Sequence, residues 1–196
     1  MKLILASNNA GKLREFREIF AGTDITILSQ AQAGVGFEAD ETGDTFEENA
    51  YLKAFGVFAA ARCGAVADDS GLCVEALDGA PGVRSARFGG GKAWTDRQKY
   101  EYLLQKLDGV ENRRAKFVSC ICCITPGGTV LRARGECPGR ILTEPQGSGG
   151  FGYDPVFAPD GYDQSFAELG EEIKNRISHR ARALAAFLAE LEKVHD

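Results

Sequence analysis

The sequence predicts an α/β protein. Short apolar runs, which are typical of buried strands, alternate along the chain with segments whose apolar residues recur at helical spacing. The first such pair is the strand-like run 2–6 and the helical segment 11–20, joined by a short polar loop. Loops between a first strand and a first helix often bind phosphate in α/β folds, because the helix N-terminus directs N–H groups at the ligand.

Composition limits the class of protein. The chain has 196 residues and 44% hydrophobic content, enough for one domain with a full core or for two lobes around a cleft. The net charge of -5 argues against a nucleic-acid partner, which would require a basic face. Without a membrane-length apolar run or a signal-peptide pattern, we expect a cytoplasmic protein with no membrane partner. The six cysteines match no zinc-site spacing and are expected to be reduced core thiols.

The loop after the first strand is a candidate phosphate site. It is not a Walker A loop, because Ala6 stands where the first glycine is needed and Leu13 follows the lysine in place of Ser or Thr. The alternative is a plain connection with an asparagine N-cap and a solvated lysine. The loop consists of Ser7, Asn8, Asn9, Ala10, Gly11 and Lys12.

An acidic loop follows the second predicted strand, at 24–28. It contains Asp40 and Glu41 and leads into the capping box 45–48, which opens a helix with an apolar stripe. Anchored carboxylates of this kind can complete an oxygen-ligand set for Mg²⁺. Asn49 and Lys53, one helical turn apart, are placed to face the same site, although solubility explains Lys53 equally well.

The outer side of this helix is also apolar. Tyr51, Leu52 and Phe55 lie off the main stripe, so another lobe or a second subunit is expected to cover them.

The most unusual stretch holds two adjacent acids, Asp68 and Asp69, inside the apolar run 64–74. Strand side chains alternate, so these two point to opposite sides unless the chain turns at Ser70 and Gly71, as we expect. Adjacent carboxylates repel, so one should be held by hydrogen bonds and the other neutralised by a cation or a raised pKa. This pattern is typical of a metal or acid/base site, although an ordinary turn explains the residues about as well.

The next segments read mainly as scaffold. A glycine-rich loop at 79–91 carries Arg84 and Arg87. It fits a loop that closes on phosphates and, equally well, a mobile surface loop or a subunit contact. A second capping box, 95–98, opens a helix, and the runs 116–125 and 129–136 form a hairpin.

A glycine-rich turn at 147–155 contains a literal G-x-G-x-x-G. The dinucleotide-binding interpretation fails because Pro155 forces Asp154 into an extended conformation where a helix should begin. Approachable backbone beside Phe151 and Tyr153 instead suits stacking against a flat base, with an aromatic turn packed on the core as the alternative.

A basic cluster precedes the last predicted helix, at 181–194. Ser178 is a natural N-cap, which places His179 and Arg180 in the first helical turn, where cations oppose the helix dipole. Such a cost suggests a function for these two residues and for Lys174 just upstream; two solvated side chains are the alternative.

Six blocks in this order resemble the inosine/xanthosine triphosphate pyrophosphatase family. They lie at 7–12, 45–50, 67–72, 79–82, 149–155 and 178–180 and span nearly the whole chain. The resemblance implies a single domain over 1–196 with an elongated two-lobed α/β fold, a mixed central sheet flanked by helices, and an active cleft between the lobes. It also implies a cytosolic, Mg²⁺-dependent homodimer that converts the purine nucleoside triphosphates ITP, dITP and XTP to monophosphate and pyrophosphate.

Carried over by position, the resemblance also implies roles for individual residues. Asp69, Asp68 and Lys12 form the catalytic group, with Asp69 as proton acceptor. The metal ligands are Asp69 and one acid of the acidic loop, where Asp40 is preferred to Glu41. The loop 7–12 and Ser70 contact the triphosphate, and the base is held by Phe151, Gly152, Tyr153, Asp154, Lys174, His179 and Arg180. The segment 89–98, with Trp94, departs from the family pattern, as does Arg84.

Overall fold

A computed structural model describes residues 1–195, without the side chains of Lys92, Val194 and His195. It divides into two compact units. Unit 1 comprises Met1–Asp69, Ser119–Gly135 and Arg180–Asp196, and unit 2 comprises Ser70–Val118 and Glu136–His179. No helix among the described residues has the length and apolarity needed to cross a membrane.

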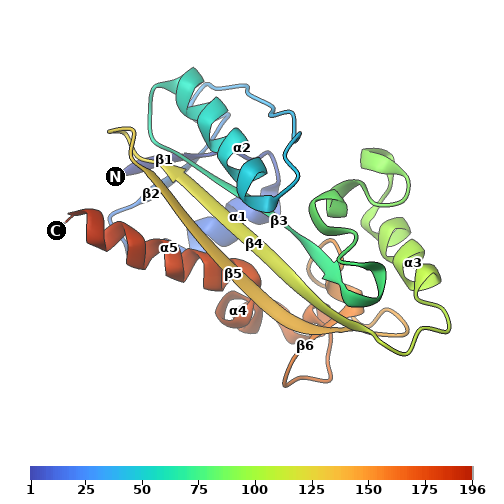
Figure 1. Ribbon diagram of the computed structural model, residues 1–196. Helices are drawn as coiled ribbons and strands as arrows, with labels where there is room; N and C mark the ends of the chain where they lie inside the picture. Colours follow the sequence, from blue (N-terminus) through green and yellow to red (C-terminus); the bar gives the residue numbers. More distant parts are fainter. Residues whose placement is uncertain (196) are drawn as a thin grey trace. The chain divides into compact units, whose positions relative to one another are not determined.

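The six strands form one mixed sheet in the order β2-β1-β3-β4-β5-β6 (Figure 1). β1 pairs in parallel with both β2 and β3, whereas β5 and β6 are antiparallel. The predicted α/β class with a mixed, helix-flanked sheet is therefore confirmed. The strands are β1 (Lys2–Leu5), β2 (Thr26–Ser29), β3 (Ala65–Val74), β4 (Arg114–Ile124), β5 (Val130–Ile141) and β6 (Phe157–Pro159).

The helices begin largely where the sequence signals place them. Both predicted capping boxes are formed, Thr45 with Glu48 and Thr95 with Gln98. The helices are α1 (Ala10–Ile19), α2 (Phe46–Ala61), α3 (Asp96–Lys106), α4 (Phe166–Ile177) and α5 (His179–His195). Four short 3₁₀ segments, η1 (Glu75–Leu77), η2 (Gly82–Arg87), η3 (Gly91–Ala93) and η4 (Asp154–Val156), complete the described structure.

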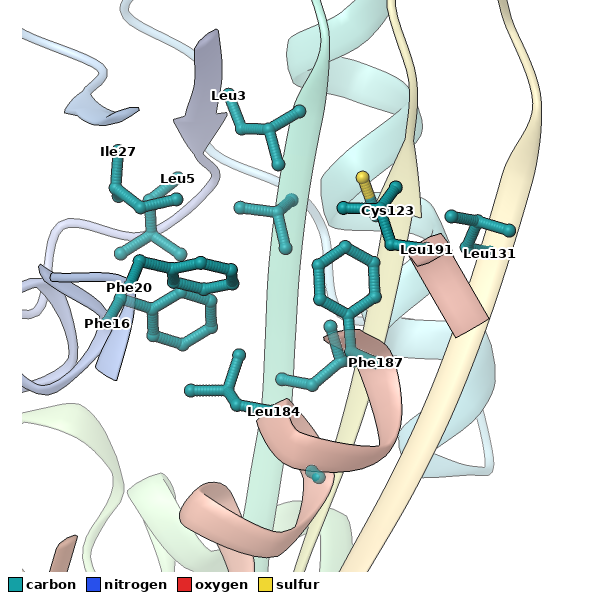
Figure 2. Close-up of a cluster of buried hydrophobic side chains, with 13 residues drawn as sticks. Leu3, Leu5, Phe16, Phe20, Ile27, Cys123, Leu131, Leu184, Phe187 and Leu191 are labelled. Carbon is teal, nitrogen blue, oxygen red and sulfur yellow. The ribbon is translucent and has the colours of Figure 1, made fainter. Parts of the chain in front are cut away.

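In unit 1, helices cover both faces of the strands. α1 and α5 lie on one face and α2 lies on the other (Figure 1). Leucine and phenylalanine side chains from α1 and α5 meet alternate residues of the strands in one buried cluster (Figure 2). Each fully buried side chain of this size contributes about 1.5–3 kcal/mol to the free energy of unfolding. This packing holds α1 and α5 against the strands, with Val66 as the contribution of β3.

In unit 2, the core is rich in aromatic rings. Phe117 packs edge-on against Phe157, with ring centroids 4.7 Å apart, and Phe157 in turn lies 5.4 Å from Phe166. Leu103 and Leu107, the apolar face of α3 and its C-cap, join the same cluster. The core therefore connects α3 and α4 to the strand segments of this unit.

Three sequence predictions need correction, and one helix was not predicted. Asp154, which was expected to be extended before Pro155, instead begins the 3₁₀ segment η4. The expected turn at Ser70 and Gly71 is absent, and β3 runs unbroken to Val74. β5 continues past Glu136 to Ile141 through Pro138, whose carbonyl oxygen accepts a hydrogen bond from Asp160 N at 3.0 Å. α4 was missed, although Ser165 and Glu168 form a third capping box, because Gly170 at φ 77° divides it into two short helical pieces.

Gly139→Ala is expected to destabilise the protein by about 1–3 kcal/mol, because an overpacked site must shift its neighbours. A Cβ atom at Gly139 would lie 2.3 Å from the carbonyl oxygen of Ala158, in the backbone of β6. Urea denaturation measures the change. Gly127→Ala is the control, since the nearest atom to its Cβ is 3.9 Å away. Equal stability of the two variants would contradict the tight β5–β6 contact.

Candidate active site

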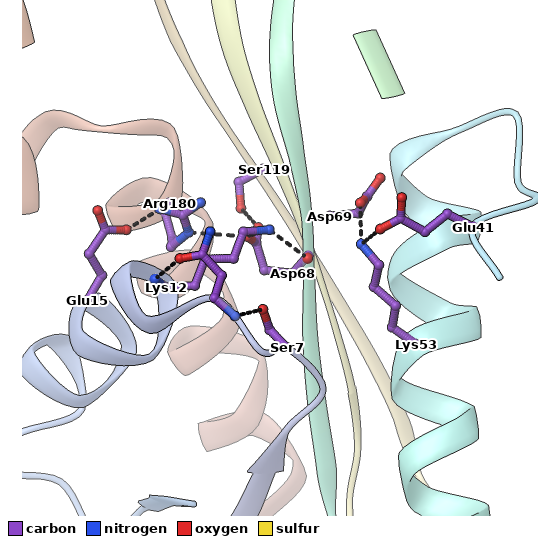
Figure 3. Close-up of polar contacts among 10 residues, drawn as sticks. Ser7, Lys12, Glu15, Glu41, Lys53, Asp68, Asp69, Ser119 and Arg180 are labelled. Atoms are coloured by element: carbon purple, nitrogen blue, oxygen red, sulfur yellow. Dashed lines mark hydrogen bonds and ion pairs between the residues drawn. The ribbon is translucent and has the colours of Figure 1, made fainter. Parts of the chain in front are cut away.

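The two adjacent acids of β3 point to opposite faces of the strand. Asp68 faces α1 and α5, whereas Asp69 faces α2 (Figure 3). Both residues are buried, with 1% of Asp68 and 6% of Asp69 exposed. Because β3 continues as a strand through both positions, the pleat itself separates the two carboxylates. Each carboxylate therefore has its own set of partners.

Asp68 is surrounded by donors from three elements. Lys12 Nζ of α1 lies 2.8 Å from Asp68 Oδ2, and Arg180 Nε of α5 donates to the same oxygen at 3.2 Å. Ser119 Oγ of β4 donates to Asp68 Oδ1 at 2.6 Å. The Arg180 guanidinium, 2% exposed, also donates from Nη1 to the Glu15 carboxylate of α1. Buried charges are thus balanced two against two.

These partners set the ionisation of Asp68. Burial on its own would raise the pKa of the carboxyl, but Lys12, Arg180 and the hydrogen bonds outweigh it and hold the pKa far below the usual range. Burial lowers the pKa of Lys12, and the positive charges of Arg180 and Lys53 add to that effect. Asp68 is therefore a permanent anion that fixes two cations, and its oxygens are already engaged by donors.

The start of α1 is open to an anion. Asn9 is the N-cap, and its Oδ1 accepts a hydrogen bond from the Lys12 backbone N–H at 3.1 Å. Asn8, Asn9 and Ala10 are exposed, and the first turn of α1 carries no acidic residue to offset the helix dipole. The predicted N-cap is confirmed, but the alternative of a solvated Lys12 is not, because its ammonium lies on Asp68.

Asp69 is paired on the α2 side through Lys53. Lys53 Nζ lies 2.5 Å from Asp69 Oδ1 and 2.6 Å from Glu41 Oε1, so one ammonium bridges two carboxylates (Figure 3). The second oxygen, Asp69 Oδ2, is buried and has no hydrogen-bond partner among the described residues. A buried carboxylate oxygen without a donor is costly, so a ligand or a proton would be stabilised there.

The acidic loop is held in place by the first turns of α2. The buried Asn49 side chain accepts a hydrogen bond from Gly43 N at 2.8 Å and donates one to Gly43 O at 3.3 Å. Asn49 and Lys53 are one turn apart, so α2 contacts this loop at Gly43 and again at Glu41. Asp40 is exposed. The structure thus joins Glu41, and not the preferred Asp40, to Asp69 through Lys53.

Burial and ion pairing have opposing effects on the pKa values of this second cluster. Burial raises the pKa of Asp69, against the opposing effect of Lys53. For Lys53, burial disfavours the charged ammonium, but Asp69 and Glu41 outweigh it and raise the pKa. A carboxylate with a raised pKa and a vacant oxygen is suited to accept a proton.

The donor set of this cluster fits a hard divalent cation. Among the side chains that the structure describes, no three from His, Cys, Asp and Glu converge on one point. The predicted ligand set was a pair, Asp69 with Asp40 or Glu41, and it stays a prediction. The Lys53 ammonium holds the carboxylates of Asp69 and Glu41 close together. A pair of carboxylates suits Mg²⁺, which takes one or two protein carboxylates together with substrate phosphates. Asp69 and Glu41 are the residues able to hold it.

A separate polar cluster forms around the turn 151–154 in unit 2. Asp154 Oδ2 accepts hydrogen bonds from Phe151 N at 2.8 Å and from Lys174 Nζ at 2.6 Å. The Lys174 ammonium lies over the partly exposed Phe151 ring, 4.3 Å from its centroid. Lys174 and Asp154 are both buried. The structure therefore assembles three of the predicted base-binding residues.

The remaining predicted base-binding residues have other surroundings. The Tyr153 ring belongs to the buried core and its hydroxyl donates to Ser85 O at 2.8 Å, and its part in base binding stays a prediction. The His179 ring stacks on Phe117, with centroids 4.8 Å apart. The Arg180 donors contact Asp68 and Glu15, so its part in base recognition stays a prediction.

Glu15 and Ser119 were missed by the sequence analysis. Glu15 lies one turn beyond Lys12 on α1, and this i, i+3 spacing is a usable signal for a shared face. Ser119 is the single hydroxyl in a long apolar strand segment, which gives a weaker signal. Nothing in the spacing alone indicates that Arg180 joins them.

Comparison with known proteins identifies the family. Residues 3–190 match the model of the Ham1 family. A protein of Deinococcus deserti called dITP/XTP pyrophosphatase is 50% identical over 188 residues, covering 96% of this chain and 88% of that protein. One of the same name from Desulfotalea psychrophila is 48% identical, covering 98% and 86%.

Solved structures agree with the sequence matches. The Ham1 protein of Staphylococcus aureus superposes with a TM-score of 0.88 at 39% identity, over 98% of this chain and 99% of that one. A HAM1 protein from Coxiella burnetii gives 0.89 at 36% identity, with the same coverage. The resemblance drawn from the sequence is therefore confirmed, and this chain belongs to the Ham1 family.

Proposed function

We propose that this protein hydrolyses deaminated purine nucleoside triphosphates, namely ITP, dITP and XTP, to the monophosphate and pyrophosphate. The observation that carries the proposal is the contrast between two neighbouring carboxylates. Both oxygens of Asp68 accept hydrogen bonds, whereas Asp69 Oδ2 has no hydrogen-bond partner among the described residues. The names of the relatives from Deinococcus deserti and Desulfotalea psychrophila support the same reaction. A pyrophosphatase for other modified bases or pyrimidines is the second candidate, because its phosphate chemistry would be the same.

Asp69 acts as the general base in this proposal. Water attacks the α-phosphorus, a new P–O bond forms, and the bond to the bridging oxygen breaks, so that pyrophosphate leaves with the electron pair. The proton of the attacking water passes to Asp69 Oδ2, which has no donor to satisfy it. A Mg²⁺ ion held by Asp69 and Glu41 would supply positive charge for the developing negative charge on the phosphates.

Lys12 and the N-terminal turn of α1 bind the phosphates. The exposed residues 8–10 precede a helix dipole that favours an anion. Asp68, Arg180 and Glu15 keep the Lys12 ammonium in place. Asp68 is thus a positioning residue for Lys12 and not a proton acceptor, because donors already occupy both of its oxygens. Ser70, which follows Asp69 in β3, adds a hydroxyl for the phosphates.

The cluster around Phe151 reads the base. Phe151 stacks on the purine, and donors from Lys174 and His179 meet the O6 acceptor of hypoxanthine or xanthine. Adenine carries an amino donor at that position and leaves the protein donors unsatisfied, at a cost of about 1–3 kcal/mol each. Two such contacts give discrimination of roughly a hundredfold or more.

We also propose a homodimer in the cytoplasm. Phe55 on the outer side of α2 is 48% exposed and stacks on Tyr51, with centroids 5.8 Å apart, as expected for a surface that a second subunit covers. All six cysteines are free thiols, which is typical of a reducing compartment.

A substrate panel tests the reaction. Pyrophosphate release from ITP, XTP, dUTP, GTP and ATP is measured with Mg²⁺ and with EDTA. We expect rapid, metal-dependent release from ITP and XTP, at least about a hundredfold above ATP in kcat/KM, because two donors must be left unsatisfied by adenine. A preference for dUTP would support the second candidate.

The control for that panel is a matched pair of substitutions. Asp69→Asn is expected to remove hydrolysis while nucleotide binding is retained, and Asp163→Asn, at an exposed surface ion pair, should leave both unchanged. If the wild-type protein binds nucleotides but releases no pyrophosphate from any of them, the result would contradict catalysis and favour a non-catalytic nucleotide-binding protein.

Glu41→Gln is expected to weaken Mg²⁺ binding more than Asp40→Asn does, by at least about tenfold, because charge-assisted contacts lose about 1.5–3 kcal/mol when the charge is removed. Glu41 is the acid joined to Asp69 through Lys53, whereas Asp40 is exposed. Calorimetric titration of the nucleotide-free protein with Mg²⁺ measures the difference. A larger loss in the Asp40 variant would restore the ligand preferred from the sequence.

A further inference from the structure

Asp96, the first residue of α3, contacts the backbone of the turn 151–154. Asp96 Oδ2 accepts a hydrogen bond from Gly152 N at 2.8 Å, although the two residues are 56 positions apart in the chain. Its other oxygen lies 3.4 Å from Lys99 Nζ, and half of the Asp96 side chain is exposed. The Gly152 amide could form its hydrogen bond with water. Its bond to the Asp96 carboxylate instead links the start of α3 to the turn 151–154.

This contact completes a two-point anchor on consecutive amides. Phe151 N donates to Asp154 Oδ2 at 2.8 Å, and the next amide, Gly152 N, donates to Asp96 Oδ2 at the same distance. The backbone between them carries the Phe151 ring. Gly150 and Gly152 both have positive φ, of 73° and 65°, so the turn bends in a way that other residues rarely allow. Carboxylate anchors restrict a turn that its glycines would leave free.

The segment before α3 determines where Asp96 lies. A Cβ atom at Gly90 would lie 1.8 Å from the Trp94 indole, so Trp94 packs directly on the Gly90 backbone. The same indole meets the Tyr102 ring of α3 edge-on, with centroids 5.7 Å apart. The Thr95–Gln98 capping box then starts the helix at Asp96. The packing of Trp94 and the capping box together therefore place the Asp96 carboxylate at the start of α3.

We propose that Asp96 is a positioning residue for purine recognition, a latch that holds the turn 151–154 in the conformation that stacks on the base. The proposal rests on the proposed function of that turn. A turn ordered in advance loses less conformational freedom on binding. The latch therefore strengthens substrate binding and leaves the chemical step at Asp69 unaffected.

Two variants of one residue test the latch. Asp96→Ala removes the acceptor and is expected to raise the KM for ITP about five- to tenfold, with kcat changed less than about twofold. Asp96→Asn keeps an acceptor oxygen and should restore a KM near that of the wild type. Glu101→Ala is the control, because it removes another exposed acid of α3, one that pairs with Arg97 within the same helix.

Hydrogen exchange gives a readout independent of activity. In the nucleotide-free protein, the Gly152 amide should exchange faster in Asp96→Ala than in the wild type, and in Asp96→Asn it should stay protected. Equal KM values for the Asn and Ala variants would assign the effect to charge at the helix start and overturn the latch, as would unchanged exchange at Gly152. If the Gly152 amide exchanges faster in Asp96→Ala but the wild-type protein does not turn over ITP, the proposed function is overturned, and the role of Asp96 in purine recognition is overturned with it.

Discussion

The alternation of side chains along β3 separates two carboxylates that would otherwise repel each other. Asp68 and Asp69 are consecutive, yet one faces α1 and α5 and the other faces α2 (Figure 3). On the first face, Lys12 and Arg180 neutralise Asp68 in a buried ion-pair network. On the second face, the Lys53 ammonium bridges Asp69 and Glu41, and Asp69 Oδ2 has no hydrogen-bond partner among the described residues. The opposite pKa shifts of the two neighbours, downward for Asp68 and upward for Asp69, follow from this geometry.

Different helices supply the partners on the two faces of β3: α1 and α5 on the side of Asp68, and α2 on the side of Asp69. α1 begins with an exposed N-terminal turn. α5 carries the buried Arg180 in its first turn, where the unfavourable interaction of its charge with the helix dipole is offset by Glu15 and Asp68. α2 organises the acidic loop through Asn49 and Lys53. Isolated buried charges are costly, so these networks are stable only when every partner is present. The helix packing in Figure 2 is what keeps those partners at hydrogen-bond distance.

Much of the fold was predictable because its signals are local. Capping boxes and apolar periodicity located α2 and α3, and the paired acids themselves indicated one locked and one perturbed carboxylate. Long-range pairing had no such signal. Arg180 reaches Glu15 across 165 positions, and spacing cannot encode that contact. The turn expected at Ser70 failed because Ser and Gly favour turns only where tertiary pairing does not extend the strand, and β3 is extended.

The most direct test of this account is a site-resolved titration of the two carboxyl groups by carbon-13 NMR in the metal-free protein. We predict that Asp69 titrates above the ordinary aspartate pKa of about 3.9 and that Asp68 stays ionised well below it. Proton acceptance by Asp69 is then lost as the pH falls through its raised pKa. In Lys53→Met, which removes a cation that lowers the pKa of Asp69, the titration should move to still higher pH. Two ordinary pKa values, or the reverse order, would contradict the account.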